Sequence, residues 1–188
     1  IKIHNLKTNH TELKEGMWNN VYEFKNSVGY FLDGDKQISS LIDIGSGTGW
    51  FVNYVLQNHP NITSIYANEP SLAAVNVAKK IYNSDIKINY LNGFADTEIP
   101  KLKKDTYVVT TFAVFQHLNF TYTKKVLQNL NKILERGSIL YFNEPIAYSR
   151  FEKFRLHYPR TENFWIKNLK EYEVSFSNKK LIIAKKIF

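Results

Sequence analysis

The residues best placed to do chemistry are three alternating glycines, Gly45, Gly47 and Gly49, and two acids, Asp43 and Glu69. Asp43 lies in an apolar run that leads into the glycines, which predicts a strand, a tight turn and a helix N-terminus. Glycine is needed where the backbone adopts a positive φ or approaches a ligand that a Cβ would block. Glu69 ends the next apolar run, where a carboxylate can accept hydrogen bonds from ribose hydroxyls. The pattern predicts a site for a nucleoside-containing ligand, although a glycine-rich turn can also be purely structural.

The residue at position 50 distinguishes two classes of cofactor whose binding sites share this strand, glycine turn and helix. The dinucleotide fingerprint, G-x-G-x-x-G/A, requires a small third residue so that the helix can pack against the strand. Counted from Gly45, that position is Trp50, and the third glycine comes one residue earlier at Gly49. The resulting G-x-G-x-G pattern resembles motif I of the class I S-adenosylmethionine-dependent methyltransferases, and it disfavours a nicotinamide dehydrogenase.

This resemblance extends from Ser39 to the C-terminus and implies S-adenosyl-L-methionine as cofactor, with S-adenosyl-L-homocysteine as product. The segment 90–100 is similar to the family's loop after the third strand, where an acid commonly binds the adenine amino group. Phe94 stands in the place of that acid, so adenine stacking on Phe94 and a contact from Asp96 are both open. The cofactor contacts that the resemblance implies are Asp43, Gly45, Ser46, Gly47, Thr48, Gly49, Glu69, Pro70, Phe94, Ala95, Asp96, Phe112 and Gln116.

Within that set, the glycines would let the backbone approach the methionyl part of the cofactor. Its carboxylate would be favoured near the positive end of the helix predicted at 48–59. Asp43 would anchor the glycine loop or bind the cofactor's amino group, and Glu69 would bind the ribose.

His117 is the candidate catalytic base. The segment 110–118 looks like the family's exit from the fourth strand, which often ends in a His before an apolar residue. A hydroxyl nucleophile needs a proton acceptor that works near neutral pH, and His supplies one. The alternative is that His117 packs or hydrogen-bonds locally at the end of the strand.

Motifs that the chain lacks narrow the reaction class. There is no cysteine, which argues against the cytosine-C5 type of methyltransferase and against disulfides and cysteine-based zinc sites. No Asn-Pro-Pro-Tyr or Asp-Pro-Pro-Tyr follows the fourth predicted strand, which counts against amino-directed DNA and protein-glutamine methyltransferases. We expect no metal ion in the site.

We expect two segments outside the alternating strands and helices to line the substrate-binding site. Aromatic residues of the N-terminal helix would close over the cofactor, and the segment 146–169 would cover the site after the fifth strand. Arginine and aromatic side chains together suit an anionic or ring-bearing substrate, and they suit a surface helix with buried aromatics equally well. The candidate substrate contacts are Trp18, Tyr22, Tyr148, Arg150, Arg155 and Trp165.

The composition is that of a globular protein. The chain has 188 residues, of which 44% are hydrophobic and 22% charged, so we expect one domain spanning 1–188 with a helical cap at 1–35. No run reaches the length of a membrane span and no secretory signal is visible, so we expect a cytoplasmic protein. The net charge of +8 fits either an anionic partner or a lysine-rich surface, and the lack of a dense basic run favours the second.

Hydrophobic periodicity predicts strands that alternate with helices, hence an α/β fold with a mainly parallel sheet covered by helices on both faces. The family resemblance implies a three-layer sandwich of seven strands in the order 3-2-1-4-5-7-6, the last one antiparallel. Helices are predicted at 11–32, 48–59, 71–83 (capped by Ser71) and 122–135 (closed by Gly137), and strands at 39–44, 62–68, 87–91, 106–111, 138–143, 171–176 and 181–187.

These inferences predict a small-molecule methyltransferase, most favourably directed at oxygen in a sugar, a sugar nucleotide or another small metabolite. The small size of the chain favours a small acceptor, with anionic ones among the candidates. Two alternatives remain open: an RNA methyltransferase that uses the basic surface, and a non-catalytic cofactor-binding or partner-binding domain.

Overall fold

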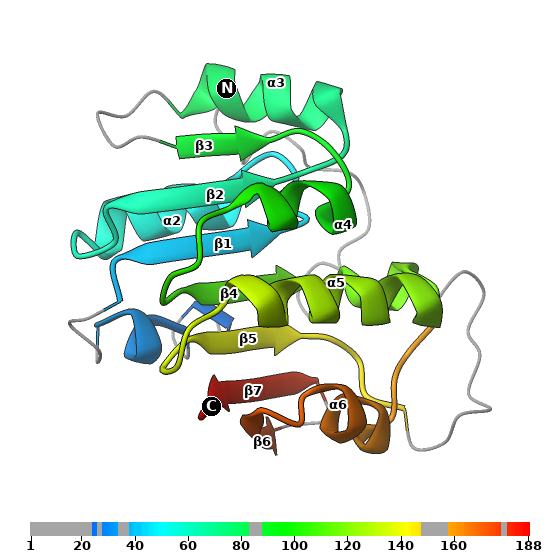
Figure 1. Cartoon of the computed structure of the whole chain (residues 1–188). Coiled ribbons are helices and arrows are strands. Elements are labelled where there is room, and N and C mark those ends of the chain that lie inside the picture. Colours follow the sequence, from blue (N-terminus) through cyan, green and yellow to red (C-terminus); the bar gives the residue numbers. More distant parts are fainter. Residues whose placement is uncertain (1–23, 26–27, 34–37, 83–87, 148–157, 178–179) are drawn as a thin grey trace, which may run out of the picture.

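The fold is built on a single twisted sheet. The computed structural model describes residues 24–25, 28–33, 38–82, 88–147, 158–177 and 180–188. Within this part of the chain, seven strands pair in the order β3-β2-β1-β4-β5-β7-β6 (Figure 1). The strands are β1 (Ser40–Ile44), β2 (Ser64–Asn68), β3 (Ile88–Leu91), β4 (Val108–Phe112), β5 (Ile139–Asn143), β6 (Tyr172–Ser177) and β7 (Leu181–Lys186).

The first five strands are parallel, whereas β7 is antiparallel to both β5 and β6. In Figure 1 the arrow of β7 accordingly points opposite to that of β5. This arrangement confirms the predicted class, strand order and antiparallel last strand. It also brings the ends of β1 to β5, and the loops that follow them, to one edge of the sheet, where ligands bind in open α/β folds.

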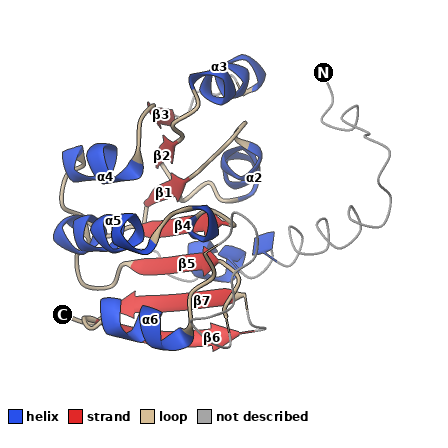
Figure 2. Ribbon diagram, turned by 90° about the vertical axis from the view of Figure 1, so that its right-hand side faces the viewer, coloured by secondary structure: helices blue, strands red, loops and turns tan. Residues whose placement is uncertain are grey.

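Helices cover both faces of the sheet. Figure 2 shows α2 and α3 on one face and α4, α5 and α6 on the other, so the predicted three layers are confirmed. The helices are α2 (Trp50–Asn58), α3 (Leu72–Ile81), α4 (Ala95–Glu98), α5 (Phe120–Ile133) and α6 (Glu162–Asn168), with short 3₁₀ turns η2 (Ile99–Lys101) and η3 (Phe115–His117).

Strand β1 shows why the sheet needs cover on both sides. All five of its residues are buried, as expected for a parallel strand with helices on each face. Ile42 and Ile44 belong to the apolar core under α5, while Leu41 belongs to the core under α2. Because side chains alternate along a strand, Asp43 shares the α2 face with Leu41 and follows it toward the edge that carries the glycines.

Capping side chains set several helix boundaries. Ser71 accepts a hydrogen bond from the N–H of Ala74, which confirms it as the predicted cap of α3. Asn119 caps α5 in the same way through the N–H of Tyr122. This cap explains why α5 begins at Phe120 rather than at the predicted residue 122.

The end of α5 corrects a second prediction. The helix ends at Ile133 rather than at residue 135, because Leu134 leaves the helix to form a β-bridge with Asp105. Gly137 has a φ of 93° and lies in the turn that leads into β5, so it does not close the helix.

The N-terminal helix predicted at 11–32 is described only in part. Residues 24–25 and 28–33 are helical, and Phe24, Val28 and Leu32 are buried at helical spacing against the α2 side of the core. No helix among the described residues has the length and hydrophobicity that crossing a bilayer requires.

Candidate functional site

The glycine turn between β1 and α2 has an opening at its middle position. All three glycines have positive φ, at 72°, 55° and 82° in chain order. A Cβ added to Gly45 would lie 2.4 Å from Val114 Cγ2, and one added to Gly49 would lie 2.9 Å from Tyr82 Cε2. Among the described residues, apart from its two chain neighbours, a Cβ added to Gly47 would meet nothing within 4 Å. Gly45 and Gly49 are therefore required by packing inside the protein, whereas no described side chain packs against Gly47 in this way.

Glu69 is brought directly to this turn. Its Oε2 accepts a hydrogen bond from the N–H of Gly47 at 2.9 Å, and its Oε1 accepts one from the N–H of Ser71 at 2.8 Å. The two bonds fix the carboxylate between the ends of β1 and β2. A carboxylate has about four lone-pair sites, so both oxygens keep room for further donors.

Asp43 is a nearly buried acid beneath the turn. It is 5% exposed, and its Oδ1 accepts a hydrogen bond from Thr110 Oγ1 at 2.8 Å. Burial raises the pKa of Asp43 to about 7, the Thr110 hydrogen bond opposes this, and the charge of Glu69 adds to it. A cation placed beside Asp43 would stabilise its ionised form.

The loop after β3 joins the same edge. Asn92 donates from Nδ2 to the carbonyl oxygens of Glu69 and Pro70, at 3.0 and 3.2 Å. Asn68 in turn donates to the carbonyls of Leu91 and Gly93. These bonds place the β3 loop beside Glu69, as the sequence predicts.

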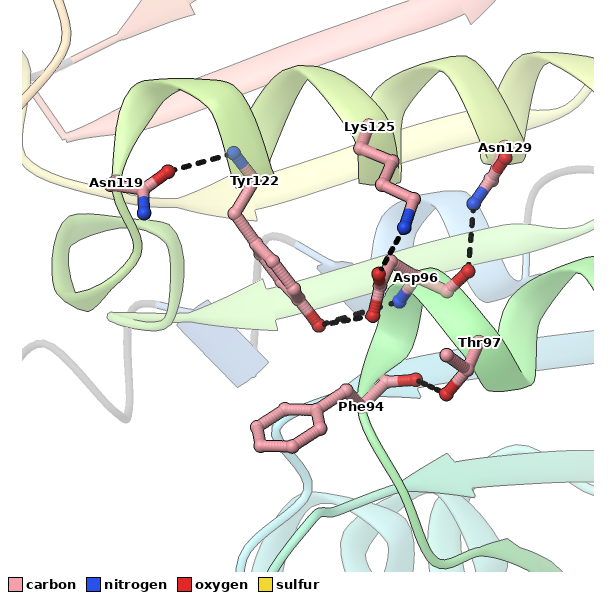
Figure 3. A network of polar contacts seen from close by, with 7 residues as sticks. All are labelled: Phe94, Asp96, Thr97, Asn119, Tyr122, Lys125 and Asn129. Carbon is pink, nitrogen blue, oxygen red and sulfur yellow. Dashed lines mark hydrogen bonds and ion pairs between the residues drawn. The ribbon is translucent and has the colours of Figure 1, made fainter.

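Within that loop, Phe94 and Asp96 have different surroundings. The Asp96 carboxylate accepts hydrogen bonds from Tyr122 Oη at 2.8 Å and from Lys125 Nζ at 2.7 Å, so α5 binds both of its oxygens (Figure 3). The hydrogen bond from Lys125 lowers the pKa of Asp96. Phe94 is 62% exposed, and its ring points away from the Asp96 carboxylate in Figure 3. The Asp96 side chain is only 11% exposed, so Phe94 is the more accessible of the two candidates for adenine recognition.

The exit from β4 carries the remaining candidates. Phe112 ends β4 and packs its ring against Trp50 and Phe24, with centroid distances of 5.6 and 5.3 Å. Gln116 and His117 lie in η3, where Gln116 Nε2 is 3.3 Å from His117 Nε2. His117 is exposed, so an acceptor molecule can reach its ring.

Two charged residues outside the list of predicted site residues surround this exit. Glu144 follows β5 and accepts hydrogen bonds from the N–H groups of Val114, Phe115 and Gln116. Arg160 donates to the carbonyls of Phe115 and Leu118. A signal for Glu144 existed, because it is an acid at the end of an apolar strand, as Glu69 is. Arg160 had no comparable local signal.

The other predicted site residues are distributed as follows. Ser46 and Ala95 are buried, while Thr48 and Pro70 are exposed at the same edge of the sheet. The predicted substrate contacts Trp18, Tyr22, Tyr148, Arg150 and Arg155 lie outside the described residues. Among the described residues, no cluster of three or more His, Cys, Asp or Glu side chains is suited to hold a metal ion.

Trp165 requires a correction. The sequence suggested that it contacts the substrate, but its side chain is fully buried and packs against Phe115, Phe142 and Phe164. It belongs to the apolar core between α6 and the sheet, because an aromatic ring on the inner face of a short helix gains most from burial there.

Comparisons with known proteins agree with this geometry. Residues 17–178 match the protein family described as "Methyltransferase domain". Curated protein sequences give no significant match to the chain. An amino pentose methyltransferase from Micromonospora echinaspora, solved with S-adenosylmethionine bound, has a TM-score of 0.68 at 13% identity, over 96% of this chain and 99% of that chain.

Two further solved structures share the fold. Human N-acetylserotonin methyltransferase, also in complex with S-adenosylmethionine, has a TM-score of 0.61 at 14% identity, over 81% of this chain and 49% of that chain. A Haloferax volcanii protein solved in complex with the methyltransferase activator Trm112 has a TM-score of 0.67 at 11% identity, over 94% and 95% of the two chains.

Proposed function

Because this chain belongs to the methyltransferase-domain family, we propose that it transfers the methyl group of S-adenosylmethionine to a hydroxyl oxygen of a small molecule. A sugar, a sugar nucleotide or another small metabolite is the acceptor class we favour. Support comes from the arrangement of the glycine turn, Glu69 and the β4 exit at one edge of the sheet.

The opening at Gly47 is the observation that carries the proposal. Its φ of 55° belongs to the left-handed region, which disfavours any residue with a Cβ. Among the described residues, apart from its two chain neighbours, no atom lies within 4 Å of where that Cβ would be, unlike at Gly45 and Gly49. The main chain at Gly47 is therefore where we place the ligand, because no described side chain occupies that position.

The surrounding residues fit the parts of the cofactor. Asp43 would hold the amino group, which is a cation, and the N-terminus of α2 would favour the carboxylate. Glu69 would bind the ribose hydroxyls, and the exposed ring of Phe94 would stack on the adenine. Bound there, S-adenosylmethionine would supply an electrophilic methyl group, so the protein mainly has to position the acceptor and exclude water.

His117 would serve as the base. Its exposed ring lies in η3, directly after the β4 exit, and it would take the proton that an acceptor hydroxyl loses as its oxygen gains the methyl group.

Thermal stability with two ligands tests the cofactor assignment. A ligand at 100 times its Kd that binds only the native state adds about 2.7 kcal/mol, which corresponds to about 5–10 °C in melting temperature for a chain of this size. We expect S-adenosylhomocysteine to produce this shift and NAD to produce none. A shift with NAD alone, or with neither ligand, would contradict the proposal.

The acceptor class is tested with a labelled methyl group. We expect label from S-adenosylmethionine to appear in pooled sugars, sugar nucleotides or phenolic metabolites, and not in RNA. Labelled RNA would favour the alternative acceptor, and cofactor binding without transfer to any acceptor would favour a non-catalytic domain.

A further inference from the structure

The loop between β4 and α5, residues 113–118, is held through its peptide groups by a single buried carboxylate. Glu144 accepts hydrogen bonds from consecutive N–H groups of the loop at 2.8, 3.0 and 3.1 Å. Hydrogen bonds to an ionised acceptor are stronger than those between neutral groups. Four donors fill the carboxylate: the N–H groups of Val114, Phe115 and Gln116, and the hydroxyl of Thr111.

Carbonyl groups of the same loop are bound by a buried cation. The guanidinium of Arg160 donates to the carbonyl oxygens of Phe115 and Leu118. It also donates to Thr123 Oγ1 at 2.5 Å, inside the first turns of α5. The main-chain N–H of Tyr158 donates to the carbonyl of Gln116 at 2.6 Å, so the segment that carries Arg160 runs beside the loop.

Both charged groups are removed from water. Glu144 and Arg160 are each 1% exposed. Burial raises the pKa of Glu144, and the hydrogen bonds from the loop oppose that shift. Burial lowers the pKa of Arg160 to about 10, and the negative charge of Glu144 opposes that shift. Because burying charge is costly, removing Glu144 would also take away the negative charge that favours the ionised form of Arg160.

The loop connects the neighbourhood of the glycine turn, where we place the cofactor, with His117, the proposed base. At its start, Ala113 has a φ of 57°, and Val114 next to it fills the space in front of Gly45. At its other end it carries Gln116 and His117. A change in the path of the loop would therefore move His117 relative to the glycine turn.

We propose that Glu144 and Arg160 are positioning residues for methyl transfer, which fix the 113–118 loop so that His117 faces the acceptor. This inference rests on the proposed function for its purpose. Among the described residues, neither Glu144 nor Arg160 makes a hydrogen bond with the glycine turn or with Glu69. The pair acts through the backbone, by binding both the donors and the acceptors of one loop.

Three readouts on Glu144→Gln and Glu144→Ala test the role. Losing a charged acceptor should raise amide hydrogen exchange at 114–116 by about tenfold or more in Glu144→Gln, and further in Glu144→Ala. The His117 ring signal in NMR, assigned with His117→Gln, should shift or broaden. The Kd for S-adenosylhomocysteine should change by less than about threefold, because the proposed cofactor contacts other than Gln116 come from other segments.

Lys186→Met is the matched control. Lys186 is another buried charge, 5% exposed, and it donates to the carbonyls of Asn131 and Leu134 at the opposite edge of the sheet. We expect it to lower the melting temperature without changing exchange at 114–116 or the His117 signal. If Glu144→Ala does not fold, Arg160→Lys keeps the charge but loses the planar donor fork, and the same readouts apply.

The outcomes separate this inference from the proposed function. Unchanged exchange and an unchanged His117 signal in folded Glu144→Gln would overturn the positioning role. Equal changes in amide exchange at 114–116 and in the His117 signal in Lys186→Met would also overturn it, since these would show a general loss of stability. If the native protein fails to bind S-adenosylhomocysteine, the proposed function falls, while exchange and the His117 signal still decide whether the pair positions the loop.

Discussion

Replacing Gly47 gives the sharpest test of the cofactor site. A Cβ at this position meets no atom of the described residues within 4 Å beyond its chain neighbours, so Gly47→Ala is expected to introduce backbone strain without a clash. Gly47→Val adds two further carbons in the same open space. If a ligand occupies that space, both variants should lose ligand binding, and the valine variant should lose more.

The cost to folding follows from the backbone conformation. A residue with a Cβ in the left-handed region costs about 1–2 kcal/mol, and for a chain of this length each kcal/mol lowers the melting temperature by about 2–4 °C. We therefore expect Gly47→Ala to melt about 2–8 °C lower than the native protein, and to remain folded.

The cost to binding comes from overlap with the ligand. Forcing extra carbon atoms into an occupied space costs about 1–3 kcal/mol, which corresponds to a Kd about 5–150 times higher. Calorimetric titration with S-adenosylhomocysteine should show at least the lower figure for Gly47→Ala, and no detectable binding for Gly47→Val.

Gly137→Ala is the matched control. Gly137 also has a positive φ, at 93°, and its added Cβ would lie at an ordinary 3.8 Å from Thr106 Cγ2, far along the sheet from Gly47. This variant should lose stability comparably and keep native affinity. The reasoning is refuted if Gly47→Val binds S-adenosylhomocysteine as the native protein does, or if Gly137→Ala loses affinity equally.

Four further predictions test other parts of the site. Glu69→Ala should weaken S-adenosylhomocysteine binding by about 1–3 kcal/mol in calorimetry, because hydrogen bonds at the ribose are lost. His117→Ala should lower label transfer far more than cofactor affinity, and equal transfer would remove its role as base. The raised pKa of Asp43, about 7, means that the folded state binds its proton more tightly than the unfolded chain. Its contribution to stability should therefore fall as pH rises from about 4 through 7, a slope that Asp43→Asn should remove from melting curves. Trp165→Ala should lower the free energy of unfolding by about 3–5 kcal/mol, and a surface-like effect below about 0.5 kcal/mol would contradict its burial.

Local patterns in the chain were enough to predict the residues of the proposed cofactor site. The glycine turn, Asp43 and Glu69 each follow a short apolar run, and strands of a parallel sheet end at one edge. The sequence therefore predicted that these residues meet, and the hydrogen bond from Gly47 to Glu69 agrees with that. The strand order came from the family resemblance, because periodicity predicts elements but not their neighbours.

Contacts between distant segments could not be predicted in this way. Glu144 and the N–H groups after β4 are 28 to 30 residues apart, and Arg160 meets Phe115 across 45 residues. No local rule links an arginine in one loop with the carbonyl groups of another. Such pairs form only when folding brings both segments together and removes them from water.

Side-chain roles also depended on packing. Phe94 and Asp96 are two residues apart and are equally open as adenine contacts in the sequence. In the structure α5 leaves the Asp96 side chain 11% exposed, whereas Phe94 is 62% exposed. Trp165 had the type of side chain that lines a substrate wall, yet it lies in the core. The sequence by itself determined where the backbone turns and which turn is rich in glycine, because φ preferences and hydrophobic period are local properties. Only the tertiary structure decided which polar side chains remain available to a ligand, because that depends on which donors and rings from distant elements satisfy or cover them first.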